Sequence, residues 1–237
     1  MTIAPSVPLK TPAPLVRLLL LLSATTGMVD AASILGMDKV FTANMTGNVV
    51  FAAFAAVGAE GFHLAYYVTA LLAFMAGAVL AGRISRLERP SRLSHWLVVA
   101  ATVEGGMLII AGLFSLFLES RPAPLVDGLY AVIALTAGAM GFRNTVVRQL
   151  KVPDLSTTVL TLTITGIASD SRLAAGDGAN QSTRLAAVAM IFAGAAAGAV
   201  LLISCGLAAT LLTSGALVMA GTFVFARHPQ MADLQRR

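Results

Sequence analysis

Long runs of apolar residues, separated by short polar segments, fill the chain from position 15 onward. A helix that crosses a membrane needs about 20 mostly apolar residues, and several runs reach or approach this length. They are Leu15–Leu35, Leu64–Leu80, Trp96–Leu118, Leu125–Thr145, Leu185–Ile203 and Leu207–Ala226. If joined, the last two would form about 60 Å of helix, twice the thickness of a bilayer core, so we expect a turn near Ser204, Cys205 and Gly206.

Two further apolar segments have an unusual polar content. One is Phe41–Gly58, which begins with asparagine, threonine and glycine residues, and the other is Ser156–Ser169, which is rich in threonine. If both crossed the membrane, the chain would have eight transmembrane helices. If both entered and left by the same face, it would have six transmembrane helices and two re-entrant or broken helical segments.

The distribution of lysine and arginine favours the six-helix arrangement, because cytoplasmic loops carry an excess of these residues. With eight crossings the 16 basic residues divide evenly between the two sides, whereas with six only Lys39 and Arg121 lie outside. The sequence therefore predicts an all-α polytopic membrane protein with six transmembrane helices and both termini in the cytoplasm. Eight transmembrane helices remain the alternative.

The composition points to lipid as the solvent and gives no sign of catalysis. Hydrophobic residues make up 57% of the chain, charged residues 11%, and the mean hydropathy is +0.85, whereas soluble domains have about 25% charged residues. The net charge of +5 comes without a long basic run, so we expect no nucleic-acid partner. A single cysteine and three scattered histidines predict no metal site, and we expect no cofactor and no enzymatic activity.

The two halves of the chain resemble each other. Gly27–Asp30 aligns with Gly141–Asn144 at an offset of 114 residues, and Gly77 aligns with Gly194 at an offset of 117. Each half reads as helix, unusual segment, helix, helix, so three crossings per half would insert the second half from the opposite face. This order is typical of the inverted-topology repeats of transporters and channels.

The repeat divides the chain into five parts. We expect a cytoplasmic N-terminal tail over 1–14, a first membrane repeat over 15–118 and an external linker over 119–124. A second membrane repeat over 125–226 and a cytoplasmic C-terminal tail over 227–237 complete the chain.

Polar residues at membrane depth define the candidate site. Irregular backbone is tolerated there only where it is buried in protein or lines a wet cavity, and a short helix that begins there directs its positive end toward the membrane centre. Alternatively, both unusual segments are ordinary crossing helices whose hydroxyl groups bond to their own carbonyls. The residues expected along a substrate or ion pathway are Asp30, Asn44, Thr46, Gly47, Asn48, Asn144, Thr157, Thr158 and Thr161.

Asp30, Glu104 and Arg143 are ionisable residues inside the apolar runs. Such groups are costly in lipid and usually face a partner or a cavity. Glu104 and Arg143 are therefore candidate charge partners in the site, and Arg143 could neutralise either carboxylate. The alternatives are a purely structural ion pair, or an Arg143 that extends to the cytoplasm. We further expect Asp30 to lie against the break at Asn44–Asn48.

The stretches Gly27–Asp30, Phe41–Asn48 and Val152–Thr161 resemble the YoaK family of bacterial inner-membrane proteins, which is known as a domain of unknown function. The resemblance covers the chain from about Leu15 to Ala226. It implies six transmembrane helices in the bacterial inner membrane and brings no substrate. Phe142-Arg143 departs from the Met-Gln pair expected there, so the resemblance does not make Arg143 a functional residue.

These observations predict a membrane transporter or channel for a small solute or ion. Its partners would be the lipid bilayer and, through small-residue helix faces such as Gly194–Gly198, further copies of the chain. The alternative is a non-transporting membrane scaffold or an intramembrane enzyme. Convergence of Asp30, Asn44 and Asn144 on one polar cavity would favour transport, whereas different helix pairs without a cavity would weaken it.

Overall fold

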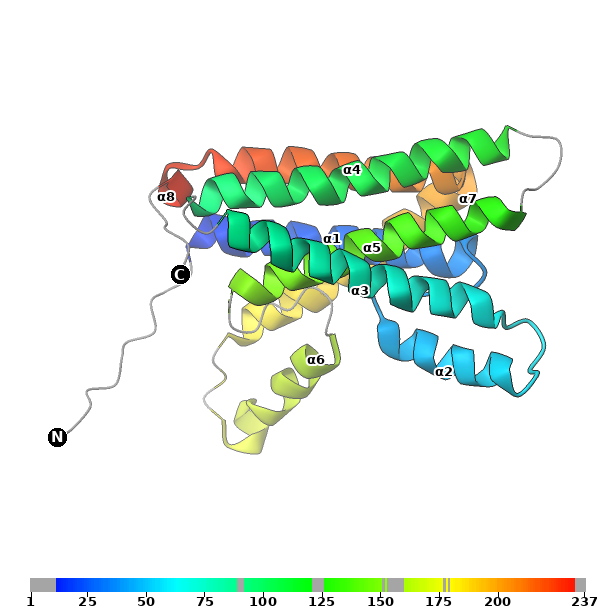
Figure 1. The fold of residues 1–237 in the computed structure, drawn as a ribbon. Coiled ribbons are helices and arrows are strands. Elements are labelled where there is room, and N and C mark those ends of the chain that lie inside the picture. The colour runs from blue at the N-terminus through cyan, green and yellow to red at the C-terminus, as the bar shows by residue number, and fades with distance from the viewer. Residues whose placement is uncertain are drawn as a thin grey trace.

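The computed structural model describes residues 12–88, 92–120, 126–150, 152, 160–176, 178 and 180–232. Regular structure within these ranges is helical, and the long helices lie side by side in a bundle (Figure 1). The elements are α1 (Ala13–Gly36), α2 (Met45–Ala56), α3 (Leu64–Leu87), α4 (Leu93–Glu119), α5 (Val126–Leu150), α6 (Leu160–Ser169), the short 3-10 helix η1 (Arg172–Ala174), α7 (Gln181–Ala226) and α8 (Pro229–Ala232).

Helix α7 consists of two arms that meet at Gly206. The backbone there has φ 85° and ψ 176°, a conformation that glycine adopts without the steric cost of a Cβ atom. The chain reverses at this point, so that the arm over 207–226 runs back along the bundle beside α4 (Figure 1). The backbone N–H of Ala208 donates to Glu119 Oε1 at 3.3 Å, which caps the start of the second arm. The expected turn is confirmed.

The helices match the apolar runs of the sequence, with longer ends. Among the described residues α1, α3, α4 and α7 are long and apolar enough to cross a membrane. Helix α5 has comparable length but contains Arg143 and Arg148. An all-helical protein with several potential membrane spans is thus confirmed, while most of the two tails and of the 119–124 linker lie outside the described residues.

The two unusual segments contain short helices that do not run the length of the bundle. Helix α2 begins near the middle of the bundle and runs back to the end at which α1 stops (Figure 1). Helix α6 lies toward the opposite end and packs against α7. Only about 12 residues of α2 are helical, or about 18 Å, which is too short for a bilayer core.

Glycines allow the long helices to approach closely, and they do so in corresponding pairs. In the α1–α7 crossing, Gly27 lies against the backbone of Ile191, and Gly194 lies against the backbone of Ala24. In the α3–α5 crossing, Gly141 lies against Phe74 and Gly77 against Gly138. The α1 and α5 positions differ by 114 residues and the α3 and α7 positions by 117. The two crossings therefore use the positions that align between the halves.

Many large apolar side chains lie on the outer surface of the bundle. Val57, Phe192 and Ile203 have exposed fractions of 82%, 77% and 81%. Water would not favour so many exposed apolar groups, and patches of this extent mark contact with lipid or protein. The surface thus agrees with the composition in making lipid the surrounding solvent.

Alanine substitution of Gly77 or Gly194 should lower the melting midpoint in detergent. A Cβ atom at either position would overlap a facing backbone carbonyl, and overpacking of this kind typically costs about 1–3 kcal/mol. Gly82→Ala and Gly106→Ala are matched controls, because a Cβ atom there meets nothing within 4 Å. Equal melting midpoints for all four variants would contradict the described helix crossings.

Candidate functional site

Arg143 and Glu104 form an ion pair inside the bundle. Arg143 is fully buried and Glu104 is 4% exposed. Arg143 Nε donates to Glu104 Oε1 at 2.6 Å, and Nη2 contacts the same oxygen. Nη1 donates to the Leu22 carbonyl at 3.0 Å and to Thr26 Oγ1 at 2.8 Å. This single guanidinium therefore joins α1, α4 and α5.

The ion pair excludes one of the alternatives for Arg143, which is extension of its side chain to the cytoplasm. Its side chain is directed into the protein, so extension to the cytoplasm is wrong. The physical reason is that Glu104 and the α1 oxygens satisfy the guanidinium within the bundle, where a lone charge would be costly. Because Arg143 is buried inside the bundle, it should not be counted among the basic residues of the cytoplasmic loops.

Asp30 is a second buried carboxylate beside this pair, and Arg143 exerts a coulombic attraction on it. Nε and Nη1 of Arg143 donate to Glu104, Leu22 and Thr26, whereas Nη2 is buried without a hydrogen-bond partner. The hydrogen bonds of Arg143 therefore go to α1 and α4 and not to the Asp30 carboxyl group. Instead, the backbone N–H of Ala43 hydrogen-bonds the Asp30 carboxyl group. Asp30 Oδ1 is buried and has no partner. The structure thus brings Asp30 against the segment that leads into α2, as the sequence predicted.

The break before α2 is held by Asn48. Its side chain pairs with both backbone groups of Phe41: the Phe41 N–H donates to Oδ1 at 2.9 Å, and Nδ2 donates to the Phe41 carbonyl at 2.5 Å. The Phe41 ring covers Gly47, where a Cβ atom would overlap it. Asn48 and Gly47 therefore fix the reversal of the chain by satisfying backbone groups that no helix pairs.

The remaining predicted site residues are dispersed. Asn44 and Thr46 lie on the exposed side at the start of α2, and Thr161 is exposed at the start of α6. Asn144 is half-buried on α5. Thr157 and Thr158 lie outside the described residues. The convergence of Asp30, Asn44 and Asn144 on one cavity, which would favour transport, is therefore not seen in the described part of the chain.

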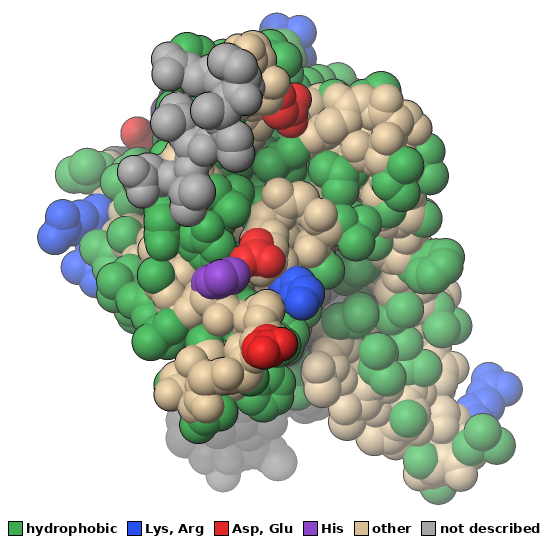
Figure 2. All heavy atoms as spheres, turned by 90° about the vertical axis from the view of Figure 1, so that its right-hand side faces the viewer, with side chains coloured by type: hydrophobic (Ala, Val, Ile, Leu, Met, Phe, Trp, Pro, Cys, Tyr) green, Lys and Arg blue, Asp and Glu red, His purple; other side chains and the backbone are tan. Residues whose placement is uncertain are grey.

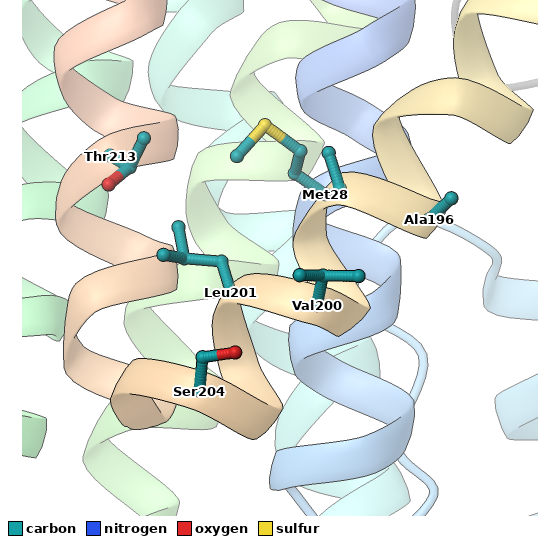
Figure 3. Close-up of a pocket in the computed structure, with 7 residues that line it drawn as sticks. Met28, Ala196, Val200, Leu201, Ser204 and Thr213 are labelled. Carbon is teal, nitrogen blue, oxygen red and sulfur yellow. The ribbon is translucent and has the colours of Figure 1, made fainter.

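A groove in the described part of the chain lies elsewhere. It is an open groove of about 550 Å³ between α1 and the two arms of α7, with Met28, Val200, Leu201 and Thr213 among its lining residues (Figure 3). Its walls are almost entirely apolar. None of the predicted site residues lines it.

Charged side chains missed by the sequence analysis gather at the end of the bundle that Figure 2 faces. His63 Nε2 lies 3.3 Å from Asp38 Oδ2, and Lys39 Nζ lies 5.3 Å from the centre of the Phe62 ring. Asp38 and Lys39 have φ values of 54° and 61°, the left-handed conformation that an αL turn requires. Only the isolated polar pair Asp38-Lys39 between two apolar runs could have indicated this turn.

Arg184 was also not selected from the sequence. Arg184 Nη1 donates to the Gly166 carbonyl at 2.6 Å and to Asp170 Oδ2 at 2.7 Å, and this hydrogen bond holds the pKa of Asp170 below its usual value. The contact attaches the end of α6 to the start of α7. Because the Asp170 side chain is exposed, its ion pair with Arg184 contributes little to the free energy of unfolding. The contact still links the end of α6 to α7.

The described residues contain no group of three or more histidine, cysteine, aspartate or glutamate side chains that could hold a metal ion. The buried charge cluster contains two carboxylates, Asp30 and Glu104, and one of these is already bound by Arg143. Within the described ranges, a chelating site for a transition metal is therefore without support.

The buried charges and the apolar exterior define an α-helical integral membrane protein. Comparison with known proteins assigns it further: residues 18–224 match the model of a family described as a protein of unknown function, DUF1275, and the chain belongs to this family. It is 30% identical over 157 residues to the UPF0700 transmembrane protein YoaK of Bacillus subtilis (strain 168). That alignment spans 65% of each chain, just under two thirds of the relative's length. No solved structure matches the chain.

Arg143→Gln should be the most damaging change in the charge cluster, because it leaves two buried carboxylates without their cation. Removing one member of a buried pair typically costs about 3–5 kcal/mol. Glu104→Gln should cost less, since Asp30 still balances the guanidinium, and the double variant should recover part of the loss. Melting in detergent measures all three.

Glu88→Gln serves as the control for this series, because Glu88 pairs with His95 at the exposed end of the bundle, where ion pairs contribute about 1 kcal/mol at most. If Arg143→Gln melts as Glu88→Gln does, the buried pair does not hold the three helices together.

Proposed function

We propose that the protein is a membrane transporter or channel for a small solute, with Asp30 and the break before α2 on its pathway. The observation that carries the proposal is the contact between the Asp30 carboxyl group and the backbone N–H of Ala43. A carboxylate and unwound backbone at membrane depth are both costly, and in transporters such breaks lie at the binding site. The pathway assignment includes Asn44 and Thr46, because they lie at the same helix start.

We further propose an inverted repeat, with six crossings and two re-entrant segments. Support comes from the glycine crossings, which recur at offsets of 114 and 117 residues. The directions of α1 and α5 along the bundle are also opposite (Figure 1), as a two-fold axis in the membrane plane requires. Under this proposal α2 and α6 are the corresponding half-helices that enter from opposite faces.

The proposed location is the bacterial inner membrane with both termini in the cytoplasm. The described basic residues at the ends of the long helices support this orientation, since most of them lie at the end of the bundle where α1 begins (Figure 1). They are Arg17, Arg83, Arg86, Arg92, Arg148 and Arg227, with Lys39 at the opposite end.

A non-transporting scaffold is the second candidate, and the apolar groove favours it. That groove excludes Asp30, Asn44 and Asn144, and Asn48 and Gly47 have evident structural roles. Assembly through small-residue faces would need other surfaces than Gly194 and Gly198, because these pack against α1 within the chain. The proposal of a non-enzymatic protein holds for both candidates.

Cysteine labelling tests the orientation. In a Cys205→Ala background, Ala59→Cys should react with a membrane-impermeant maleimide on intact cells, whereas Leu87→Cys should react only after permeabilisation. Both positions are exposed, at opposite ends of α2–α3. Labelling of position 87 from outside intact cells would reverse the orientation, and labelling of both would refute six crossings.

Flux through proteoliposomes tests transport. Concentration jumps of amino acids, sugars, carboxylic acids and inorganic ions, recorded on a solid-supported membrane, should give a current or flux for at least one class. Asp30→Asn should lower that flux by at least about tenfold, equivalent to about 1.4 kcal/mol, while Glu60→Gln, on the exposed loop, should leave it unchanged. Wild-type flux in Asp30→Asn, or no flux above empty vesicles, would favour the scaffold.

A further inference from the structure

The buried charge cluster is not neutral. It contains two carboxylates, Asp30 and Glu104, and one guanidinium, Arg143. Glu104 takes the guanidinium through two of its nitrogens, and the third nitrogen is bonded to α1 oxygens. The formal charge that remains is the negative charge of Asp30, which a proton or a cation from outside the chain can compensate.

Two oxygen atoms in the region of Asp30 lack a partner. Asp30 Oδ1 and Thr42 Oγ1 are both buried and both lack a hydrogen-bond partner. Thr42 directly precedes Ala43, whose N–H reaches the Asp30 carboxyl group. Since consecutive Cα atoms are about 3.8 Å apart, the two orphaned oxygens belong to one small region.

The unpaired hydroxyl of Thr42 differs from the other buried hydroxyls nearby in the sequence, which are hydrogen-bonded. The buried hydroxyls of Ser23, Thr25 and Thr26 all donate to carbonyls of their own helix. Thr42 has no helix carbonyl within reach, because it lies in the non-helical segment between α1 and α2. An unpaired hydroxyl in such a place is retained where something absent from the protein chain binds it.

We propose that Asp30 Oδ1 and Thr42 Oγ1, with water completing the shell, bind a monovalent cation of the Na⁺ class. Oxygen is the ligand that hard cations prefer, and the carboxylate of Asp30 offsets the positive end of α2, which begins at Met45. The cluster as a whole carries one formal negative charge, which balances a monovalent ion better than a divalent one. The proposal rests on the role given to Asp30 above, and it names the ion bound there.

Access to the site is consistent with exchange of the ion. Asp30 as a whole residue is half-buried, although its Oδ1 is fully buried. Thr42 and Ala43 are buried, while Asn44, the next residue, is exposed. Only one residue along the chain therefore separates the exposed Asn44 from the buried oxygen of Thr42.

Equilibrium binding in detergent tests the site independently of any flux. At constant ionic strength, replacing choline chloride by NaCl should raise the melting midpoint by several degrees in a saturable manner, because a ligand that binds only the folded state stabilises it. Radioactive ²²Na⁺ should bind the purified full-length protein with one site per chain. Unlabelled NaCl should displace it and choline chloride should not.

Variants separate the ligands from the packing. Asp30→Asn and Thr42→Val should abolish both the Na⁺-dependent stabilisation and ²²Na⁺ binding, whereas Thr42→Ser, which keeps the hydroxyl, should retain them. Thr25→Val is the matched control, since its hydroxyl is satisfied within α1, and it should respond to Na⁺ as the wild type does.

Three results would overturn the proposal. The first is equal melting midpoints in NaCl and choline chloride for the wild type, and the second is a Na⁺ response that survives Thr42→Val. The third is stabilisation that follows pH and not Na⁺, which would mean that Asp30 takes up a proton. Na⁺ binding without any solute flux would instead leave the cation site standing and refute the transporter. Flux that depends on Asp30 without Na⁺ binding would do the reverse.

Discussion

A bilayer offers no water to polar groups, so every buried donor and acceptor must find its partner inside the protein. The strongest expression of this constraint is the guanidinium of Arg143, which is satisfied by Glu104 on α4 and by oxygens of Leu22 and Thr26 on α1. Three helices from different parts of the chain are held in register by one side chain. The same constraint places Asn48 against Phe41, where it replaces the backbone partners that a helix would supply.

Close helix packing supplies the rest of the attraction, since lipid is as apolar as the side chains and gives little hydrophobic drive between helices. The glycines at 27, 77, 141 and 194 bring backbones together at two crossings. At a third crossing, Gly105 and Gly215 face each other's carbonyls between α4 and the second arm of α7. Small residues and buried polar contacts thus do together what a large apolar core does in a soluble domain.

Much of this architecture could be predicted from the sequence, because hydropathy and glycine spacing report the physics of helices in lipid. The apolar runs, the turn at Gly206, the position of Asp30 against the break and the presence of a partner for Arg143 all follow from local composition or charge cost. The sequence could not decide between Asp30 and Glu104 as that partner, because the choice depends on the rotation of α4 relative to α5. Likewise the αL turn at Asp38 and Lys39, and the Arg184 contact with Gly166, depend on the relative placement of segments distant in the chain.

The aligned positions of the two halves carry side chains of different charge. Asp30 ends the motif of the first half, and Asn144 stands at the same place in the second. Arg143 likewise stands where the first half has Val29. Asp30 is a carboxylate that Arg143 leaves unbound by hydrogen bonds, whereas Asn144 at the aligned position is neutral. A buried charge therefore stands at one of the two aligned positions and not at the other, so the two halves of the chain differ in their electrostatics although their helix crossings correspond.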